Sequence, residues 1–193
     1  VEDKTVEVTF KGETYSEVNN EYSGEVIVPQ TVNFDDIDFR VVGIGDGTFV
    51  DCKLLKSIVL PSSVTRIGNY AFGDCSGLTS IEIPKGITEI GSEAFSGCSG
   101  LTSIELPESV ISIGDAAFGD CSALTSVKLS EGVISIGRCA FSECSALTSI
   151  EIPSSVTRIG DMAFYGCSGL TSIKIPEGVT IIDERTFYGC IGL

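Results

Sequence analysis

Histidine is absent from the 193 residues, and basic residues are scarce, with 12 Lys and Arg against 27 Asp and Glu. Without an imidazole, the chain alone cannot form a Cys–His pair, a Ser–His–Asp triad or a His-ligated metal site. The net charge of −15 means that phosphate backbones and anionic membrane surfaces repel the chain. We therefore expect no catalytic residues, no cofactor or metal, and no nucleic-acid partner.

Long apolar runs and phosphate-binding motifs are also missing. No apolar run approaches the roughly 18 residues of a membrane span, so we expect no membrane insertion. The first residues, VEDKTVEVTF, lack the basic-then-apolar order of a signal peptide. The chain is therefore either cytosolic or exported with its signal peptide already removed. Neither Gly-rich phosphate-binding pattern occurs in the expected context.

A strict 23-residue repeat fills most of the chain. Phe72, Cys75 and Leu78 recur at this interval in every later unit, with Ile or Val three residues after each complete unit's Leu. The units are residues 41–63, 64–86, 87–109, 110–132, 133–155 and 156–178, with a partial unit at 179–193. This period, with its L-x-x-L-x-L core, predicts a right-handed leucine-rich-repeat solenoid, because one unit cannot bury its own apolar residues.

Each unit predicts two short strands and a turn. Ile81 and Ile83 flank Glu82 with period two, which predicts a strand with the isoleucines in the core and Glu82 in solvent. Ile87 and Ile90 predict a second extended piece. Ala94 and Phe95, with Cys98 after them, have the spacing of one helical or 3-10 turn. The repeated Phe should form an internal column.

Seven of the eight cysteines keep identical offsets in successive units. Stacked coils would project their side chains in parallel, which fits disulfide geometry poorly, so we expect a buried column of reduced thiols. Cys139 stands apart, at the variable position that Tyr70 and Met162 occupy in other units. We expect it to be partly exposed.

Residues 1–40 break the period and predict a polar β cap over the open end of the solenoid. GEVIVPQTV, residues 24–32, matches the end of a unit, and TVEVTF and EYSGEVIV alternate as strands do. The segment after Val32 predicts a hairpin that turns at Asp35 and Asp36. With Asp38 these carboxylates suggest calcium, but six to eight ligands are needed, so a solvated hairpin tip is the preferred interpretation.

The pattern A-F-x-x-C-x-x-L-x-x-I-x-I-P-x-x-V-x-x-I-G resembles the BspA-type leucine-rich repeat of bacterial, especially gut and oral, surface proteins. Residues 41–193 carry it, with departures such as Ser130 for Pro and Asp183 for Gly. The resemblance implies an extracellular or cell-surface protein that binds other macromolecules, including adhesion to matrix proteins or other cells. It carries over no catalytic residues.

The outward face of the first strand is the main candidate for ligand contact. Its residues alternate a constant Ser with a variable, mostly charged position: Ser80, Glu82, Ser103, Glu105, Ser126, Lys128, Ser149, Glu151 and Lys174. Opposite charges on neighbouring strands stabilise a sheet, so a self-neutralising ladder with no ligand is an equal alternative. Two other candidates are the aromatic pair Tyr165 and Tyr188 and the apolar step of Ile111 and Ile134.

Three functions fit this sequence. The first is a non-enzymatic extracellular module for protein interaction or adhesion, with a protein or glycan on another cell or matrix as partner. The second is a structural spacer or display scaffold for another domain. The third, an ice- or crystal-binding array, rests on the repeated Thr79, Thr102, Thr125, Thr148 and Thr171. We also expect weak end-to-end self-association through the uncapped C-terminal coil that stops at Leu193.

Overall fold

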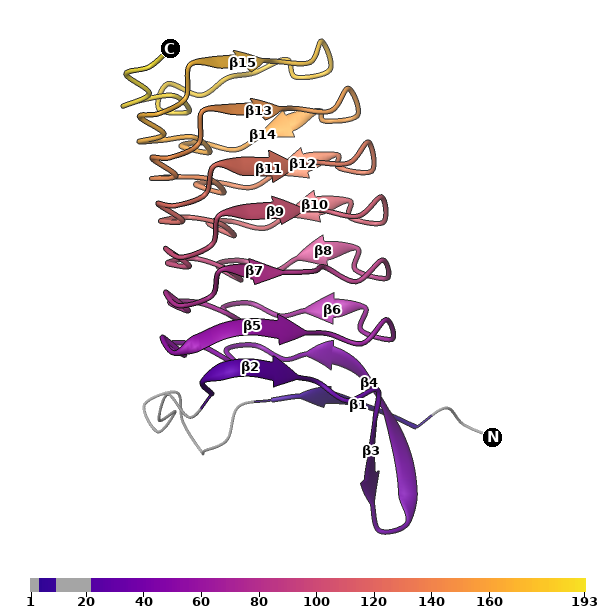
Figure 1. The fold of residues 1–193 in the computed structure, drawn as a ribbon. Helices are drawn as coiled ribbons and strands as arrows, with labels where there is room; N and C mark the ends of the chain where they lie inside the picture. The colour runs from indigo at the N-terminus through magenta and orange to yellow at the C-terminus, as the bar shows by residue number, and fades with distance from the viewer. Residues whose placement is uncertain (1–3, 10–21) are drawn as a thin grey trace.

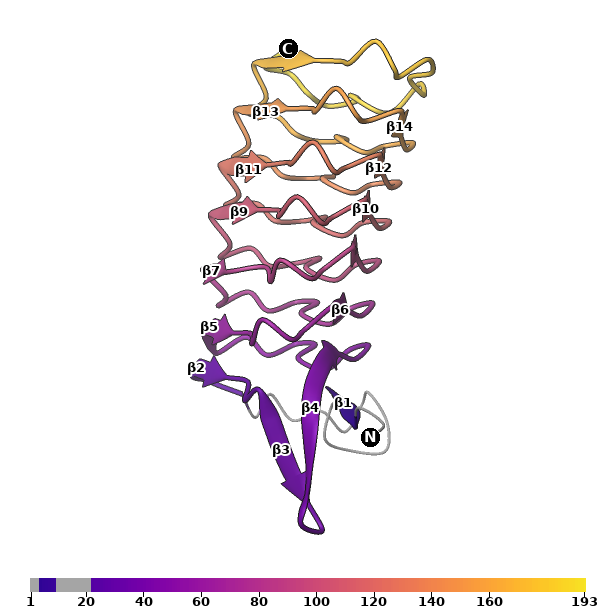
Figure 2. The same cartoon turned by 90° about the vertical axis from the view of Figure 1, so that its right-hand side faces the viewer.

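The computed structural model describes residues 4–9 and 22–193, which form a single stack of coils (Figure 1). Residues 1–3 and 10–21 of the predicted cap lie outside the described residues. Two ladders of short strands run on opposite sides of the stack (Figure 2). Successive coils are related by 23 residues, so the predicted leucine-rich-repeat solenoid is confirmed.

The first ladder contains the Ser-Ile-Glu segments. Its strands, all parallel to their neighbours, are β2 (Gly24–Ile27), β5 (Leu55–Val59), β7 (Ser80–Ile81), β9 (Ser103–Glu105), β11 (Ser126–Lys128), β13 (Ser149–Glu151) and β15 (Ser172–Lys174). Hydrogen bonds join them as β2-β5-β7, β9-β11 and β13-β15. Ile104 and Ile150 point into the core and the residues on either side of them are exposed, which is the predicted alternation.

The second ladder forms where the sequence predicts a second extended piece. Its strands are β4 (Ile37–Ile44), β6 (Arg66–Ile67), β8 (Glu89–Ile90), β10 (Ser112–Ile113), β12 (Ser135–Ile136) and β14 (Arg158–Ile159). They are parallel and form one continuous sheet in that order. Strands β6, β8, β10, β12 and β14 each bury their isoleucine, and the residue before it is exposed or half-buried.

The core is a set of columns that run along the stack. The Phe rings from Phe49 to Phe187 stack nearly parallel, with centroids 5.2–5.6 Å apart. The six rings from Phe49 to Phe164 are almost fully buried, and burial of each stabilises the fold by about 1.5–3 kcal/mol. Tyr22 packs edge-on against Phe49 and ends the column. The predicted aromatic interior is confirmed.

The seven repeated cysteines form a second column beside the rings. All are free and buried, as predicted, and six of them donate an S–H hydrogen bond to the Phe carbonyl of the preceding coil, at 2.9–3.2 Å. Cys121, for example, bonds to the carbonyl of Phe95 at 3.2 Å. Each thiol therefore links two coils without a covalent bond.

The third side of each coil consists of 3-10-type turns. Ala94 donates to the carbonyl of Gly91, and Ser96 to that of Glu93, three residues apart in both cases, at 3.2 and 3.1 Å. Glu93 has a φ of 54° and Gly97 a φ of 70°. Left-handed residues interrupt helical geometry, so the turns stay separate, and the described residues contain no helix.

The N-terminal segments close the first end of the stack. β1 (Thr5–Val8) pairs in parallel with β4, and β3 (Thr31–Phe34) pairs antiparallel with β4 in a hairpin that projects beyond the coils (Figure 1). Asp35 and Asp36, with φ values of 50° and 58°, form the predicted turn. The side chain of Thr48, which replaces the repeated Ala, donates to the carbonyls of Gly45 and Val8 and so fastens β1 to the first coil.

Candidate ligand-binding faces

The predicted contact residues on the first ladder lie together on one exposed face. All nine side chains are exposed, and the strands place them in register, as for Ser103 opposite Ser126. Glu105 and Lys128 form an ion pair, and this contact raises the pKa of the lysine. Glu151 lies opposite Lys174 in register, but the described contacts include no ion pair between them. The face is thus exposed and only partly self-neutralised.

The predicted aromatic pair lies on the turn side, away from both ladders. The rings of Tyr165 and Tyr188 stack with centroids 5.4 Å apart and planes 11° from parallel. Tyr188 is 63% exposed and Tyr165 is half-buried. The two tyrosine rings therefore stack at the surface in the same way as the Phe rings stack in the core.

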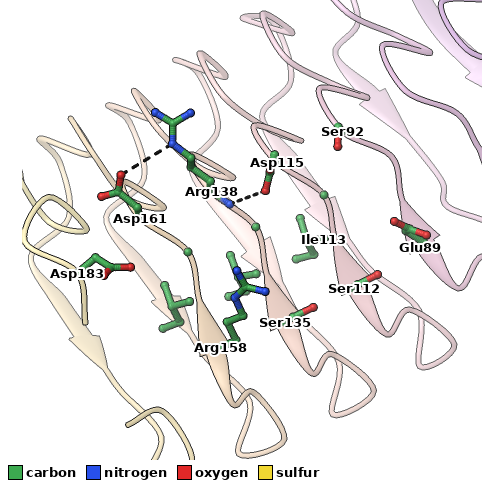
Figure 3. A pocket seen from close by; sticks show the side chains of 15 residues that line it. Glu89, Ser92, Ser112, Ile113, Asp115, Ser135, Arg138, Arg158, Asp161 and Asp183 are labelled. Atoms are coloured by element: carbon green, nitrogen blue, oxygen red, sulfur yellow. Dashed lines mark hydrogen bonds and ion pairs between the residues drawn. The ribbon is translucent and has the colours of Figure 1, made fainter. Parts of the chain in front are cut away.

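A shallow polar groove of about 570 Å³ lies on the second ladder (Figure 3). One wall is the outward residue of four successive strands, Glu89, Ser112, Ser135 and Arg158. The other wall follows the next bend of each coil and includes Asp115, Arg138 and Asp161. None of the lining residues is aromatic, and none of them belongs to the face favoured from the sequence.

The glycine between the two walls is required by the stacking of the coils. A Cβ on Gly91 would lie 2.6 Å from the carbonyl carbon of Gly68, a contact that real Cβ atoms do not make. In the seventh coil Asp183 occupies this position, and no strand forms there. The glycine column therefore lets successive coils stack closely at the bend between the two walls.

The charged side chains of the groove differ in their hydrogen-bond and ion-pair partners. Asp115 accepts a hydrogen bond from the backbone N–H of Arg138 at 2.8 Å, and the Arg138 guanidinium lies 3.8 Å from the carboxylate of Asp161. Arg158 has no ion-pair partner among the described residues. Arg66, at the same offset in an earlier coil, is paired with both Glu7 and Asp46 at 3.0 and 2.7 Å. Glu7 of the cap and Asp46 of the first coil thus neutralise Arg66, whereas Arg158 is available for other contacts.

The predicted apolar step borders the groove. Ile111 and Ile134 are 52% and 44% exposed and lie immediately before Ser112 and Ser135. The N–H of Ile134 donates to the carbonyl of Ile111 at 2.8 Å, so their backbones are adjacent. The step is thus an exposed apolar pair beside two small hydroxyls, at the edge of the groove.

The thiols and carboxylates of the chain are placed as follows. Burial raises the pKa of the repeated thiols, to about 12 for Cys167, so they stay protonated and poorly nucleophilic. Cys139 is half-buried, and burial also raises its pKa. Across residues 4–9 and 22–193, no group of three or more Cys, Asp or Glu side chains could hold a metal ion. Asp38, at the hairpin tip, accepts a hydrogen bond from Asn33.

Sequence reasoning missed the groove, although a signal for it was present. The first ladder was chosen because a variable position lies beside constant ones. The position of Glu89, Ser112 and Arg158 meets the same criterion, since it lies directly before a constant Ile. The position of Ser92, Asp115 and Arg138, which follows the repeated Gly, meets it as well. Only the fold shows that these two columns form opposite walls.

The comparisons with known proteins agree with this architecture. The family model described as the BspA type leucine-rich repeat region matches residues 42–145 and 88–193, in six copies. Comparison with curated proteins gives no match. No helix long and apolar enough to cross a bilayer occurs in the part of the chain that the structure describes.

Solved structures of bacterial proteins resemble the whole stack. A leucine-rich repeat protein of Bacteroides ovatus is 31% identical with a TM-score of 0.66, over 93% of this chain and 51% of its own. A leucine-rich cell surface protein of Faecalibacterium prausnitzii is 32% identical with a TM-score of 0.65, over 90% and 51%. The chain therefore spans about half the length of these two proteins.

A third structure is similar in fold alone. The pneumococcal vaccine antigen PcpA is 23% identical with a TM-score of 0.67, over 89% of this chain and 43% of its own. The family model covers most of the chain, and the repeat, the two ladders and the stacked Phe column are those of the solenoid described above. The chain therefore belongs to the BspA-type leucine-rich repeat family of bacterial proteins.

Proposed function

We propose that the chain is a non-enzymatic binding module of a bacterial cell-surface or secreted protein, and that it attaches to a protein or glycan on another cell or matrix. One observation carries this proposal. The interior columns repeat almost without change, whereas one outward column of each ladder, that of Glu105 and Lys128 and that of Glu89 and Arg158, differs from coil to coil. A rigid scaffold with a variable surface is how repeat proteins bind partners. The F. prausnitzii cell-surface protein supports the location.

A structural spacer is the second candidate. The strict 23-residue period and the ion pair of Glu105 with Lys128 favour it, because a regular, self-neutralised face needs no ligand. A spacer would leave all outward residues interchangeable. The groove argues against a spacer, because its outward residues are not interchangeable. The two central coils have an exposed Ile followed by Ser at the positions where the flanking coils have Thr followed by a charged residue.

An ice- or crystal-binding array is the weakest candidate. The hydroxyls of Thr79, Thr125 and Thr171 donate to backbone carbonyls of the preceding coil at 3.2, 3.0 and 3.1 Å. Hydroxyls that bond to their own backbone are poorly placed to order an ice surface. We expect a thermal-hysteresis assay to show no activity, and activity at micromolar concentration would revive this function.

A binding screen with paired variants tests the proposal. The chain is applied to glycan and matrix-protein arrays beside one variant with Glu82, Glu105, Lys128 and Glu151 changed to Ser. A second variant has Glu89, Arg138 and Arg158 changed to Ser. Loss of a shared ligand in one variant locates the site on that ladder. Absence of any ligand for the unmodified chain would support the spacer instead.

A further inference from the structure

The two ends of the groove carry opposite charges. Glu89 and Arg158 lie in one outward column, separated by Ser112 and Ser135 on the two strands between them. Both are exposed, and the part of the chain that the structure describes gives neither an ion-pair partner. Figure 3 shows them at the two ends of the column. This column of the groove thus has one acidic and one basic end, and the opposite wall adds Asp161 and Asp183 on the side of Arg158.

The centre of the groove has small polar side chains, with an apolar pair beside them. Ser112 and Ser135 are half-buried hydroxyls that can donate to or accept from a bound backbone. Ile111 and Ile134 offer an apolar ledge beside them. The lining has no aromatic face on which a sugar ring could pack. A polypeptide fits this composition better than a glycan.

The spacing of the charges matches an extended chain. Three strand spacings of about 4.8 Å separate Glu89 from Arg158 by about 14 Å. Residues i and i+4 of an extended segment are about 13 Å apart, and i, i+2 and i+4 project to the same side. A segment lying across the strands would therefore bring residues i and i+4 over the two charges, with residue i+2 over the centre.

We propose that this groove binds an extended protein segment along the solenoid axis. A cationic side chain of the segment meets Glu89, a carboxylate four residues away meets Arg158, and an apolar side chain between them packs on Ile111 and Ile134. The guanidinium of Arg138 makes a long ion pair with Asp161, at 3.8 Å, and lies near the carboxylate end of the bound segment. This inference rests on the proposed binding function and gives it a site and a partner class.

The test uses ¹⁵N-labelled protein and three peptides observed by NMR titration. The matched peptide is acetyl-Gly-Lys-Thr-Leu-Thr-Glu-Gly-amide. The control has the same composition with its charges adjacent, Gly-Lys-Glu-Thr-Leu-Thr-Gly. The third peptide, Gly-Lys-Thr-Leu-Thr-Lys-Gly, is cationic at both ends. We expect the matched peptide to shift the amides of Ser112 and Ser135 and to bind more tightly than the adjacent-charge control.

Charge reversal at Arg158 supplies the specific readout. Arg158→Glu should weaken the matched peptide by roughly fivefold, the effect of one exposed ion pair, and should strengthen the doubly cationic peptide. Lys174→Glu makes the same change in net charge on the opposite ladder, where the lysine has no ion-pair partner among the described residues. That variant should leave the preference between peptides unchanged.

The outcomes separate this inference from the function it rests on. Equal effects of Arg158→Glu and Lys174→Glu, equal binding of matched and control peptides, or a glycan ligand that the groove variants abolish would overturn the peptide assignment. If a ligand from the array screen still binds after all groove substitutions, the assignment of the site to the groove is wrong, but the proposed binding function stands. If no ligand is found in any of these assays, both the groove assignment and the binding function are wrong.

Discussion

At the scale of single residues, the chain separates side chains that specify the fold from side chains that face solvent. The constant apolar positions, such as Phe118 and Cys121, are fully buried, so packing explains their repetition. Their identity and burial could be predicted from the sequence, because a residue that recurs in every unit at one offset occupies one column of the stack. The same logic leaves the variable residues undetermined, since nothing in the core constrains them.

Removing one ring from the Phe column should destabilise the whole stack. Phe118 stacks on Phe95 and Phe141 at 5.3 and 5.4 Å and is completely buried. We expect Phe118→Ala to lower the free energy of unfolding by about 3–5 kcal/mol, measured by urea denaturation. Ile111→Ala, at an exposed position, is the control and should cost little. A loss under about 1 kcal/mol for Phe118→Ala would contradict the burial described here.

The buried thiols should make stability fall at alkaline pH. Burial raises the pKa of Cys98, Cys121 and Cys144 well above the ordinary value of 9.0. Their contribution is therefore complete below the pKa of the unfolded chain and declines as the pH rises through the range between the unfolded and folded values. The loss is about 1.4 kcal/mol for each thiol and each pH unit in that range.

Unfolding free energies measured from pH 8 to 10.5 would test this. Cys121→Ala should flatten the decline by the share of one thiol, whereas Cys139→Ala, at the half-buried position, should flatten it much less. An unchanged slope in the Cys121 variant would show that its thiol ionises as freely in the folded chain as in the unfolded one.

At the scale of elements, the strands were predictable and the geometry of the turns was not. Alternation around Ile81 or the Ile87–Ile90 pair indicates a strand directly. The turn column of Tyr70, Glu93, Ala116, Cys139 and Met162 is different, because all five are left-handed, with φ between 50° and 58°. Glycine and asparagine usually mark that conformation. None of the five is either residue, so the sequence carried no signal for it.

Replacing the left-handed alanine by glycine should stabilise the protein. Ala116 has a φ of 50°, and relief of its Cβ strain exceeds the added flexibility of glycine in the unfolded chain. We expect Ala116→Gly to raise the free energy of unfolding by about 0.5–1 kcal/mol. Ala117→Gly, at the adjacent buried position outside the left-handed region, should lower it. Thermal and urea unfolding of the pair would test the assignment, which fails if both variants are destabilised alike.

The candidate site also forms at the scale of elements, and this explains why the groove was overlooked. Ser112 and Asp115 are three residues apart, but the glycine bend between them turns them into opposite walls. Linear spacing predicts which column a residue joins. It does not predict how two columns are oriented across a bend. The exposure of the first-ladder residues could be predicted because strand alternation alone determines it.

At the scale of the whole molecule, the stack is a series of nearest-neighbour contacts between equivalent coils. The coils from residue 64 onward repeat the same backbone hydrogen bonds, as in Phe72 to Ala94 and Phe95 to Ala117, both at 2.8 Å. Stability in such an array is approximately a sum over coils and the interfaces between them. Changing the number of coils should therefore alter stability in steps and leave the fold intact.

Deleting one complete coil tests this additivity. Removal of residues 110–132 joins Ser109 to Val133, which occupies the position of Val110 in the repeat. We expect a folded protein with the same circular dichroism per residue, a lower midpoint and a smaller denaturant slope, because less surface is exposed on unfolding. Removal of residues 110–121, half a coil, shifts every later column and should prevent cooperative folding. Similar unfolding of the two deletions would refute the columnar arrangement.

The thiol column affects how the protein folds and how it resists oxidation. Six of its seven cysteines donate S–H bonds from the interior, and no crosslink holds the coils together. Folding therefore needs no oxidant and no disulfide isomerase, and added reductant should not weaken the fold. Because the sulfurs are enclosed, peroxide reaches them only after unfolding. A stack built in this way is equally suited to anaerobic and to oxygenated surroundings.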